Sequence, residues 1–196
     1  MAERKATVIR ETAETNVRVA LNLDGNGQFE ITTGMRMFDH LLTQLAQHGI
    51  FDIKISASGP DQHHVIEDVA IALGKAFNQS LGDKQGITRM AHAVVPMDEA
   101  LAMVAVDIGG RVYSVIEAAF NEANIGDMDA DLVRHFLVSL ASEAKINLHA
   151  KVLSGINDHH KAEALFKALA RALDSATRTD ERISGRVPST KEVIEG

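Results

Sequence analysis

The sequence predicts an α+β fold built from two copies of one unit, in which a strand hairpin is followed by a helix, a strand and a second helix. Two observations indicate this. The spacing of apolar residues switches between the period typical of strands and the period typical of helices. The second half of the chain also repeats the residue pattern of the first half. We therefore expect a single domain with two pseudo-repeats, at about residues 6–85 and 89–178, and a C-terminal tail at 179–196.

The first copy begins with a strand segment over residues 7–23, where Val17 and Val19 alternate with polar or small residues. The sequence DGNG at Asp24–Gly27 is typical of a hairpin turn, so we expect the chain to return over residues 29–31. The remaining elements expected in this copy are a helix over 38–49 that Gly49 terminates, a strand over 50–57 and a helix over 64–81.

The second copy follows the same order. Apolar residues alternate through 91–108, Gly109-Gly110 predicts the turn, and residues 112–116 return from it. The remaining elements expected are a helix over 132–144, a strand over 146–153 and a helix over 162–176. Early segments of the two copies align at an offset of 85 residues, and later motifs align at offsets of 95 and 96. A duplication explains these offsets, whereas an open solenoid needs more repeats.

The strongest chemical signal is a His-His-x-x-Glu motif that occurs once in each copy, at residues 63–67 (HHVIE) and 159–163 (HHKAE). On a helix, residues three and four apart lie on one face, so an imidazole and a carboxylate can meet at one point. A single pair is often only a polar helix start, but its recurrence in a duplicated frame favours a metal site. Without cysteine, the ligand set suits Mn, Fe, Ni or Zn. An Asx residue precedes each pair and predicts a helix N-terminus, where the helix dipole favours neutral imidazole.

Two more histidines, His40 and His135, occupy equivalent positions in the two copies. A histidine on an apolar helix is often a core residue, but the matched positions favour a third ligand for each site. His48 has no histidine at its matched position, so we expect it to contact substrate instead. His92 and His149 belong to no such constellation and are interpreted as structural.

Other polar residues suggest the rest of a site. Glu14 and Glu99 are at equivalent places, although a solvated strand-edge carboxylate is an equal alternative for Glu99. Arg89, Arg111 and the tail segment 184–191 offer the donors that a phosphate monoester needs. Alone, such a tail is more often a solvated terminus. The chain has no Walker loop, no dinucleotide fingerprint and no serine nucleophile elbow.

Composition excludes several classes of protein. The net charge of −7, the lack of a Lys/Arg block and the 4% aromatic content argue against a nucleic-acid partner. The longest apolar run, 100–106, is far shorter than the ~20 residues that a bilayer requires, so no membrane partner is expected. The N-terminus has no apolar core typical of a signal peptide. We therefore expect a soluble, cytoplasmic protein.

Four segments and the two His-His-x-x-Glu motifs together resemble one known family. The segments are 38–49 (FDHLLTQLAQHG), 96–102 (PMDEALA), 107–111 (DIGGR) and 188–191 (PSTK). From about Ala6 to Lys191, the sequence resembles the monofunctional imidazoleglycerol-phosphate dehydratases. The resemblance implies a carbon–oxygen lyase of histidine biosynthesis that dehydrates D-erythro-imidazole glycerol phosphate to imidazole acetol phosphate. It also implies a fold with a helical layer between two sheets.

The resemblance further implies two Mn²⁺ ions per subunit and a homo-oligomer of 24 subunits built from trimers, with active sites between subunits. The metal ligands that it implies are His40, His63, His64, Glu67, His135, His159, His160 and Glu163. The substrate-binding positions that it implies are Glu14, His40, Gln44, His48, His63, Glu67, Arg89, Arg111, His159, Lys167, Ser189, Thr190 and Lys191. Glu14 is the leading candidate for proton transfer, with Glu67 and His48 as weaker catalytic candidates.

Two other classes of protein remain as alternatives. A di-iron carboxylate protein also uses Glu and His three residues apart, but the strand hairpins argue against its four long helices. A metal-buffering oligomer would keep the histidines but has no need of Arg111, Lys191 or Glu14. The sequence leaves open which ligands group around which metal.

Overall fold

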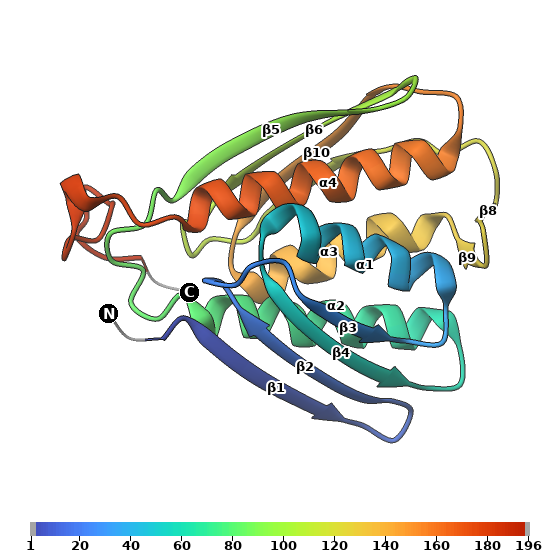
Figure 1. Cartoon of the computed structure of the whole chain (residues 1–196), viewed down its shortest axis with the longest axis horizontal. Coiled ribbons are helices and arrows are strands. Elements are labelled where there is room, and N and C mark those ends of the chain that lie inside the picture. Colours follow the sequence, from blue (N-terminus) through green and yellow to red (C-terminus); the bar gives the residue numbers. More distant parts are fainter. Residues whose placement is uncertain (1–2, 195–196) are drawn as a thin grey trace.

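The computed structural model describes residues 3–194 and has three layers, with four α-helices enclosed between two four-stranded sheets (Figure 1). Each half of the chain provides one sheet and two helices. The predicted α+β class and the repeated strand–helix pattern are confirmed, and so is the helical layer between the sheets. The residue boundaries of the two pseudo-repeats stay a prediction.

The first half forms a sheet in the order β1-β2-β4-β3. Its elements are β1 (Lys5–Glu11), β2 (Asn16–Asn22), β3 (Phe29–Thr32), α1 (Arg36–Gly49), β4 (Asp52–Ser58) and α2 (Gln62–Ser80). The segment expected as one strand over 7–23 is instead the hairpin β1–β2. The predicted hairpin across Asp24–Gly27 is wrong, because β4 lies between β2 and β3 and β3 pairs with β4 in parallel.

Burial explains why β4 takes this central place. Ile53 and Ile55 of β4 are buried and pair with Leu21 and Val19 of β2, which are also buried. Placing β4 beside β2 removes these side chains from water together, which stabilises the fold. The four-residue β3 is mostly exposed and stays at the edge, where short strands are tolerated.

The second half repeats this arrangement in a sheet of order β5-β6-β10-β7. Its elements are β5 (Met90–Met97), β6 (Ala100–Asp107), β7 (Tyr113–Glu117), β8 (Asn124–Ile125), β9 (Met128–Asp129), α3 (Asp131–Ala144), β10 (Asn147–Ser154) and α4 (Asp158–Thr177). The predicted hairpin at Gly109-Gly110 is wrong for the same reason, since β7 pairs in parallel with β10. Residues 118–130, here called the insertion, connect β7 to α3 and contain β8 and β9, whereas only residues 33–35 make the equivalent connection in the first half.

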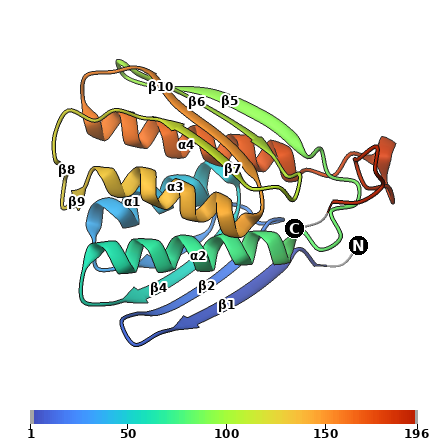
Figure 2. The ribbon, with the colours of Figure 1, turned by 180° about the vertical axis from the view of Figure 1, so that it is seen from behind.

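Helices from different halves pair within the central layer. In the views from both sides, α1 lies beside α4 and α2 lies beside α3 (Figures 1 and 2). Phe38 of α1, Phe136 of α3 and Phe166 of α4 meet at the centre, with ring centroids 5.5 Å apart for Phe38–Phe136 and 5.2 Å apart for Phe136–Phe166. All three side chains are buried, and each contributes about 1.5–3 kcal/mol by leaving water. No helix within residues 3–194 combines the length and apolar character needed to cross a bilayer.

The N-terminal ends of the helices gather around the insertion. Asp127 accepts hydrogen bonds from the first backbone N–H groups of α1, at Arg36 (2.9 Å) and Met37 (2.8 Å). The side-chain oxygen of Gln62, at the start of α2, accepts a hydrogen bond from the backbone N–H of Asp129. The helices α2 and α4 begin earlier than predicted, at residues 62 and 158, so both His-His pairs lie in first turns.

The end of α1 differs from the prediction in one detail. Gly49 is the last helical residue, but Ile50 takes the left-handed conformation, with φ of 59°. Gly49 is needed for another reason: a Cβ there would lie 2.4 Å from the ring of Phe51. Glycine at this position therefore permits close packing of Phe51 under the helix.

Candidate metal centres

The first candidate metal centre, here called the α2–α3 cluster, consists of His63 and Glu67 of α2 and His135 of α3. Their ligand atoms all lie within 4.8 Å of one another. The rings of His63 and His135 are stacked with centroids 4.5 Å apart. His135 Nε2 is buried and has no hydrogen-bond partner among the described residues, since Glu67 Oε1 is 3.5 Å away. A buried nitrogen that converges with a carboxylate without bonding it suits a metal ion as the missing partner.

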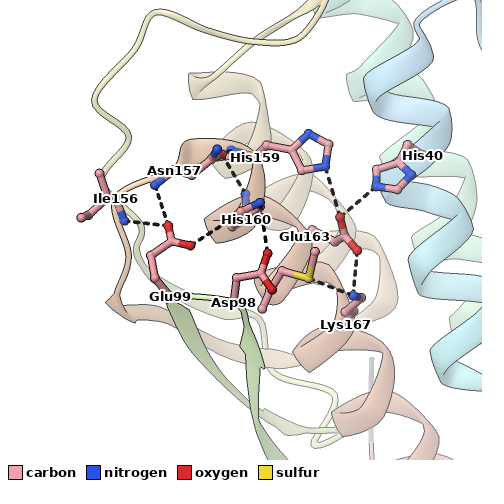
Figure 3. A network of polar contacts seen from close by, with 10 residues as sticks. His40, Asp98, Glu99, Ile156, Asn157, His159, His160, Glu163 and Lys167 are labelled. Carbon is pink, nitrogen blue, oxygen red and sulfur yellow. Dashed lines mark hydrogen bonds and ion pairs between the residues drawn. The ribbon is translucent and has the colours of Figure 1, made fainter.

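The second candidate, the α1–α4 cluster, consists of His40 of α1 with His159 and Glu163 of α4 (Figure 3). Glu163 Oε2 is hydrogen-bonded to His40 Nε2 at 3.0 Å and to His159 Nε2 at 3.2 Å. Its other oxygen forms an ion pair with Lys167 Nζ at 2.7 Å. Burial alone would raise the pKa of Glu163, but the bonds from Lys167 and His40 outweigh it and lower the pKa to about 2. Glu163 is therefore ionised and able to act as a ligand.

Each cluster combines ligands from both halves of the chain. The α2–α3 cluster takes its motif residues from the first half and His135 from the second, whereas the α1–α4 cluster does the reverse. This follows from the helix pairing, because the first helix of each copy packs against the second helix of the other copy. The two clusters are thus equivalent under the duplication, and one donor set occurs twice.

The second histidine of each motif lies outside both clusters. His64 is hydrogen-bonded through Nδ1 to Asp61 (2.7 Å), and His160 through Nδ1 to Glu99 (2.7 Å). Adjacent helical residues point about 100° apart, so the two histidines of a pair cannot face one centre. The hydrogen bond to Asp61 raises the pKa of His64, and the hydrogen bond to Glu99 raises the pKa of His160, a shift opposite in direction to the one expected from the helix dipole. A nearby carboxylate outweighs the helix dipole.

The two equivalent glutamates both lie against these outer histidines. Glu14, in the turn between β1 and β2, has its Oε2 3.3 Å from His64 Nε2. Glu99, in the turn between β5 and β6, also accepts hydrogen bonds from the backbone N–H groups of Ile156 (3.1 Å) and Asn157 (2.8 Å), as Figure 3 shows. Glu99 is thus a structural partner of His160 and of the start of α4, although its side chain stays exposed. Neither Asp61 nor Glu99 is predicted from the sequence as a histidine partner. Asp61 lies three residues before His64, so its role could have been predicted from spacing, whereas Glu99 is 61 residues from His160 and reaches it only in the folded chain.

Three further predicted residues extend the α1–α4 cluster toward the other end of its helices. Gln44 lies one turn along α1 from His40, and its side chain is hydrogen-bonded to His48 Nε2 at 3.1 Å. Lys167 lies one turn along α4 from Glu163. Burial and the charge of Lys167 lower the pKa of His48. These residues can contact a molecule that also reaches the cluster.

The predicted phosphate-binding residues lie at the opposite end of the helical layer. The Arg89 side chain donates hydrogen bonds to Asp107 (2.7 Å) and to the carbonyl of Pro188 (2.7 Å). Its backbone N–H donates to the carbonyl of Ala176 at the end of α4. Arg111 is placed near the end of α3, because the backbone N–H of the preceding Gly110 donates a hydrogen bond to the carbonyl of Lys145. The tail with Ser189, Thr190 and Lys191 follows the end of α4 (Figure 1). Because α4 spans 20 residues, about 30 Å separates this end from the start of α4, where its cluster residues lie. One chain does not bring these two groups together.

Comparisons with known proteins show the family of this chain. The family model of imidazoleglycerol-phosphate dehydratase matches residues 33–173. The chain is similar to the enzyme of that name from Dehalococcoides mccartyi (57% identity, 100% of both chains) and from Methanothermobacter thermautotrophicus (51%, 96% of both).

Solved structures of the family have the same fold. The enzyme from Staphylococcus aureus superposes with a TM-score of 0.83 at 31% identity, covering 90% of this chain and 99% of that one. The enzyme from Pyrococcus furiosus, solved in complex with (S)-C348, gives a TM-score of 0.83 at 36% identity, covering 95% and 99%. The chain belongs to the imidazoleglycerol-phosphate dehydratase family.

Proposed function

We propose that the two clusters are metal centres at which this chain dehydrates imidazoleglycerol phosphate, a step of histidine biosynthesis. The observation that carries the proposal is the convergence of His63, Glu67 and the unpartnered, buried His135 Nε2. The equivalent α1–α4 cluster supports it, because two ions fit a substrate whose imidazole ring has two nitrogen atoms. The family relationship supplies the substrate and the reaction.

The proposed metal is Mn²⁺, with two ions per chain, as the family resemblance implies, and the donor chemistry is compatible with it. Each cluster offers two imidazole nitrogens and one carboxylate and no sulfur, which suits a borderline or hard divalent ion. A bound divalent ion acts as a Lewis acid that stabilises negative charge on a ligand's imidazole ring. The clusters leave coordination positions for other donors, since each provides three protein ligands.

The outer histidines are the proposed additional ligands. His64 and His160 each bond a carboxylate through Nδ1, which orients the ring, and Nε2 is the proposed metal-binding atom. In His64 the metal would replace the contact of Nε2 with Glu14 Oε2 at 3.3 Å. Since neither can face its own cluster, the ion that it binds is shared with another copy of the chain. A homo-oligomer of 24 subunits built from trimers, as the family resemblance implies, would provide such contacts.

The distance between the two ends of the helical layer supports the same assembly. Arg89, Arg111 and the tail residues Ser189, Thr190 and Lys191 form the proposed phosphate-binding end. Arg89 holds the tail through the Pro188 carbonyl, so its proposed role includes placing the tail. A substrate that contacts a metal centre and this end together lies between two copies. Gln44, His48 and Lys167 are the proposed contacts beside the α1–α4 cluster, whose His40 and His159 also face the substrate. His63 and Glu67 are the proposed substrate contacts of the α2–α3 cluster.

Dehydration removes a proton from carbon and a hydroxyl group from the neighbouring carbon, so the chain must supply a proton carrier. Glu14 is the leading candidate because its carboxylate is exposed and lies beside the α2 motif. Glu67 is weaker because it is placed to bind the metal, and His48 is weaker because it lies toward the other end of α1.

Metal removal and reloading tests this function. The chelated protein should lose turnover of imidazoleglycerol phosphate and dissociate to trimers or smaller species in light scattering, and Mn²⁺ should restore both. Metal analysis should give two ions per chain in the native protein and one in His63→Ala, a variant of the α2–α3 cluster alone. Full turnover without metal would exclude the proposal. Restored metal binding and assembly without turnover would instead indicate a metal-buffering oligomer.

A further inference from the structure

A buried carboxylate lies where the first sheet contacts α2. Asp68 follows the cluster residue Glu67 in α2 and is 6% exposed. Its Oδ1 accepts a hydrogen bond from Arg10 Nε of β1 at 2.6 Å, and its Oδ2 accepts one from the hydroxyl of Thr15. A buried charge is costly unless it is paired and hydrogen-bonded, and Asp68 is both.

The network continues from Asp68 to the backbone of Glu14. Thr15 Oγ1 lies 3.1 Å from Thr12 Oγ1. The Thr12 hydroxyl accepts hydrogen bonds from the backbone N–H groups of Glu14 (3.1 Å) and Thr15 (2.9 Å). The turn over residues 12–15 is thus tied to α2 through two hydroxyl groups, a common way for threonine to fix a turn.

The opposite side of this turn is also fixed. Gly59 follows β4, and a Cβ there would lie 3.0 Å from Thr15 Cγ2 and 3.3 Å from the carbonyl oxygen of Glu14. The backbone of Gly59 therefore packs directly against the turn. Together with the hydroxyl network, this contact leaves the Glu14 backbone little room to move.

The second half does without these polar groups. At the same offsets it carries Val95, Met97, Ala100 and Ala164 in place of Arg10, Thr12, Thr15 and Asp68. The strand registers confirm the offset, since Lys5 pairs with Asn22 and Met90 with Asp107. An apolar sheet–helix contact is therefore sufficient in the second half, so the repeated fold does not require this network.

We propose that Asp68, acting through Thr15 and Thr12, is a positioning residue that holds Glu14 beside His64 of the α2 motif. The inference rests on the proposed role of Glu14 in proton transfer. The helix α2 is the common support, because Glu67 faces α3 while Asp68 faces the strands. A proton carrier must be held within a fraction of an ångström of its working position. The exposed Glu14 side chain has only His64 as a polar partner among residues 3–194, so its backbone must provide that precision.

Substituting Thr12 tests the proposal without emptying the buried site. Thr12→Val keeps the side-chain shape but removes the acceptor for two N–H groups. It should lower kcat roughly 10- to 100-fold, with KM, metal content and assembly unchanged. Thr12→Ser should restore kcat. Thr177→Val is the matched control, because it removes a buried hydroxyl that donates to the Asp174 carbonyl at the far end of α4, and it should leave kcat unchanged. Asp68→Asn should repeat the loss of kcat.

A double-mutant cycle with Glu14→Gln separates this inference from the proposed function. If Thr12 acts through Glu14, Thr12→Val should lower kcat no further in the Glu14→Gln background. A further loss there, or unchanged kcat in Thr12→Val alone, would overturn only the positioning role. Loss of metal from Thr12→Val would also overturn it. Full turnover in Glu14→Gln alone would reject the role of Glu14 itself, and this inference with it.

Discussion

The two copies of the repeat place a glutamate beside a histidine at equivalent positions but hold it differently. In the second copy, the hydrogen bond from His160 and the backbone bonds from Asn157 and Ile156 lower the pKa of Glu99 to about 2. In the first copy, the Glu14 side chain is 58% exposed and lies 3.3 Å from His64, its one polar partner within residues 3–194. At Glu14 the surrounding structure fixes the backbone, through the hydrogen bond from its N–H to Thr12, and leaves the carboxylate exposed.

This difference shows how a duplicated unit can separate structural and chemical roles. A carboxylate whose lone pairs are already occupied stabilises its surroundings but has little capacity to accept a proton. A carboxylate with free lone pairs on a fixed backbone can exchange a proton with a bound molecule. The first copy therefore carries the proposed proton carrier, and the second carries its structural counterpart.

The largest expected effect comes from neutralising each glutamate in turn. Glu14→Gln keeps the side-chain shape but cannot accept a proton, so kcat should fall about 10²–10⁴-fold with metal content and assembly intact. Glu99→Gln should lower kcat far less. Steady-state kinetics of the Mn²⁺-saturated variants measures both. Similar losses in the two variants would remove the distinction between the copies.

The next largest effect is expected on the free energy of unfolding, when the packing under the first helix of a copy is changed. Gly49 and Phe51 in the first copy align with Ala144 and Ile146 in the second. Since a Cβ at Gly49 would lie 2.4 Å from the Phe51 ring, Gly49→Ala should destabilise the protein by about 1–3 kcal/mol. Adding Phe51→Ile should recover much of this loss. Denaturant unfolding measures both, and an unaffected Gly49→Ala would mean that the ring moves aside freely.

The clusters should also differ in metal affinity. Lys167 pairs with Glu163 in the α1–α4 cluster, whereas Ile71 stands at the matched position near the α2–α3 cluster. An entering ion must displace the lysine and is repelled by it, so the α1–α4 cluster should bind Mn²⁺ more weakly. The substitution His135→Ala removes a ligand of the α2–α3 cluster, so that binding at the α1–α4 cluster can be measured alone. In this background, Lys167→Met should tighten Mn²⁺ binding about tenfold, a change of about 1.4 kcal/mol. Competition with a chelating dye would show this, and unchanged affinity would contradict it.

The smallest expected effect concerns acid stability. Asp52 Oδ1 accepts hydrogen bonds from the backbone N–H groups of Asn26 (2.9 Å) and Gln28 (3.1 Å), and the bond from Asn26 contributes most to lowering the pKa of Asp52. The matched residue in the second copy, Asn147, does not titrate. A lowered pKa stabilises the folded state above the unfolded pKa of ~3.9, and this stabilisation is lost as pH falls through the folded value.

Asp52→Asn should therefore cost about 0.5–1.5 kcal/mol at neutral pH, since the amide oxygen still accepts but carries no charge. The variant should also lose less stability than the parent protein between pH 5 and pH 2. Urea unfolding across this range measures the difference. Parallel pH profiles for the two proteins would assign the acid sensitivity to other groups.

The duplication and the donor types could be predicted from local sequence alone. Period-two and period-3.6 patterns located the strands and helices, because burial on one face imposes these spacings. The equal spacing of His63 and His159 from their glutamates identified the ligand type, since helical neighbours three and four apart share a face. Both signals depend only on residues close together in the chain.

Strand pairing and ligand grouping depend on contacts between distant segments. The turns at Asp24–Gly27 and Gly109-Gly110 look like hairpins, but β4 and β10 pair beside β2 and β6, where buried apolar residues of the paired strands lie side by side. Likewise, nothing near His40 in the sequence indicates that it joins His159 rather than His63. That choice follows from the packing of α1 against α4, which buries apolar faces from both halves.

The sequence by itself determined the fold class, the repeat and the eight imidazole and carboxylate candidates for binding metal. Only the tertiary structure decided that six of them form two crossed clusters while His64 and His160 point elsewhere. It also decided that the phosphate-binding candidates lie at the opposite end of the helices from the start of α4. The physical reason is that local patterns fix which face of a helix is apolar, whereas helix-to-helix packing fixes which two faces meet.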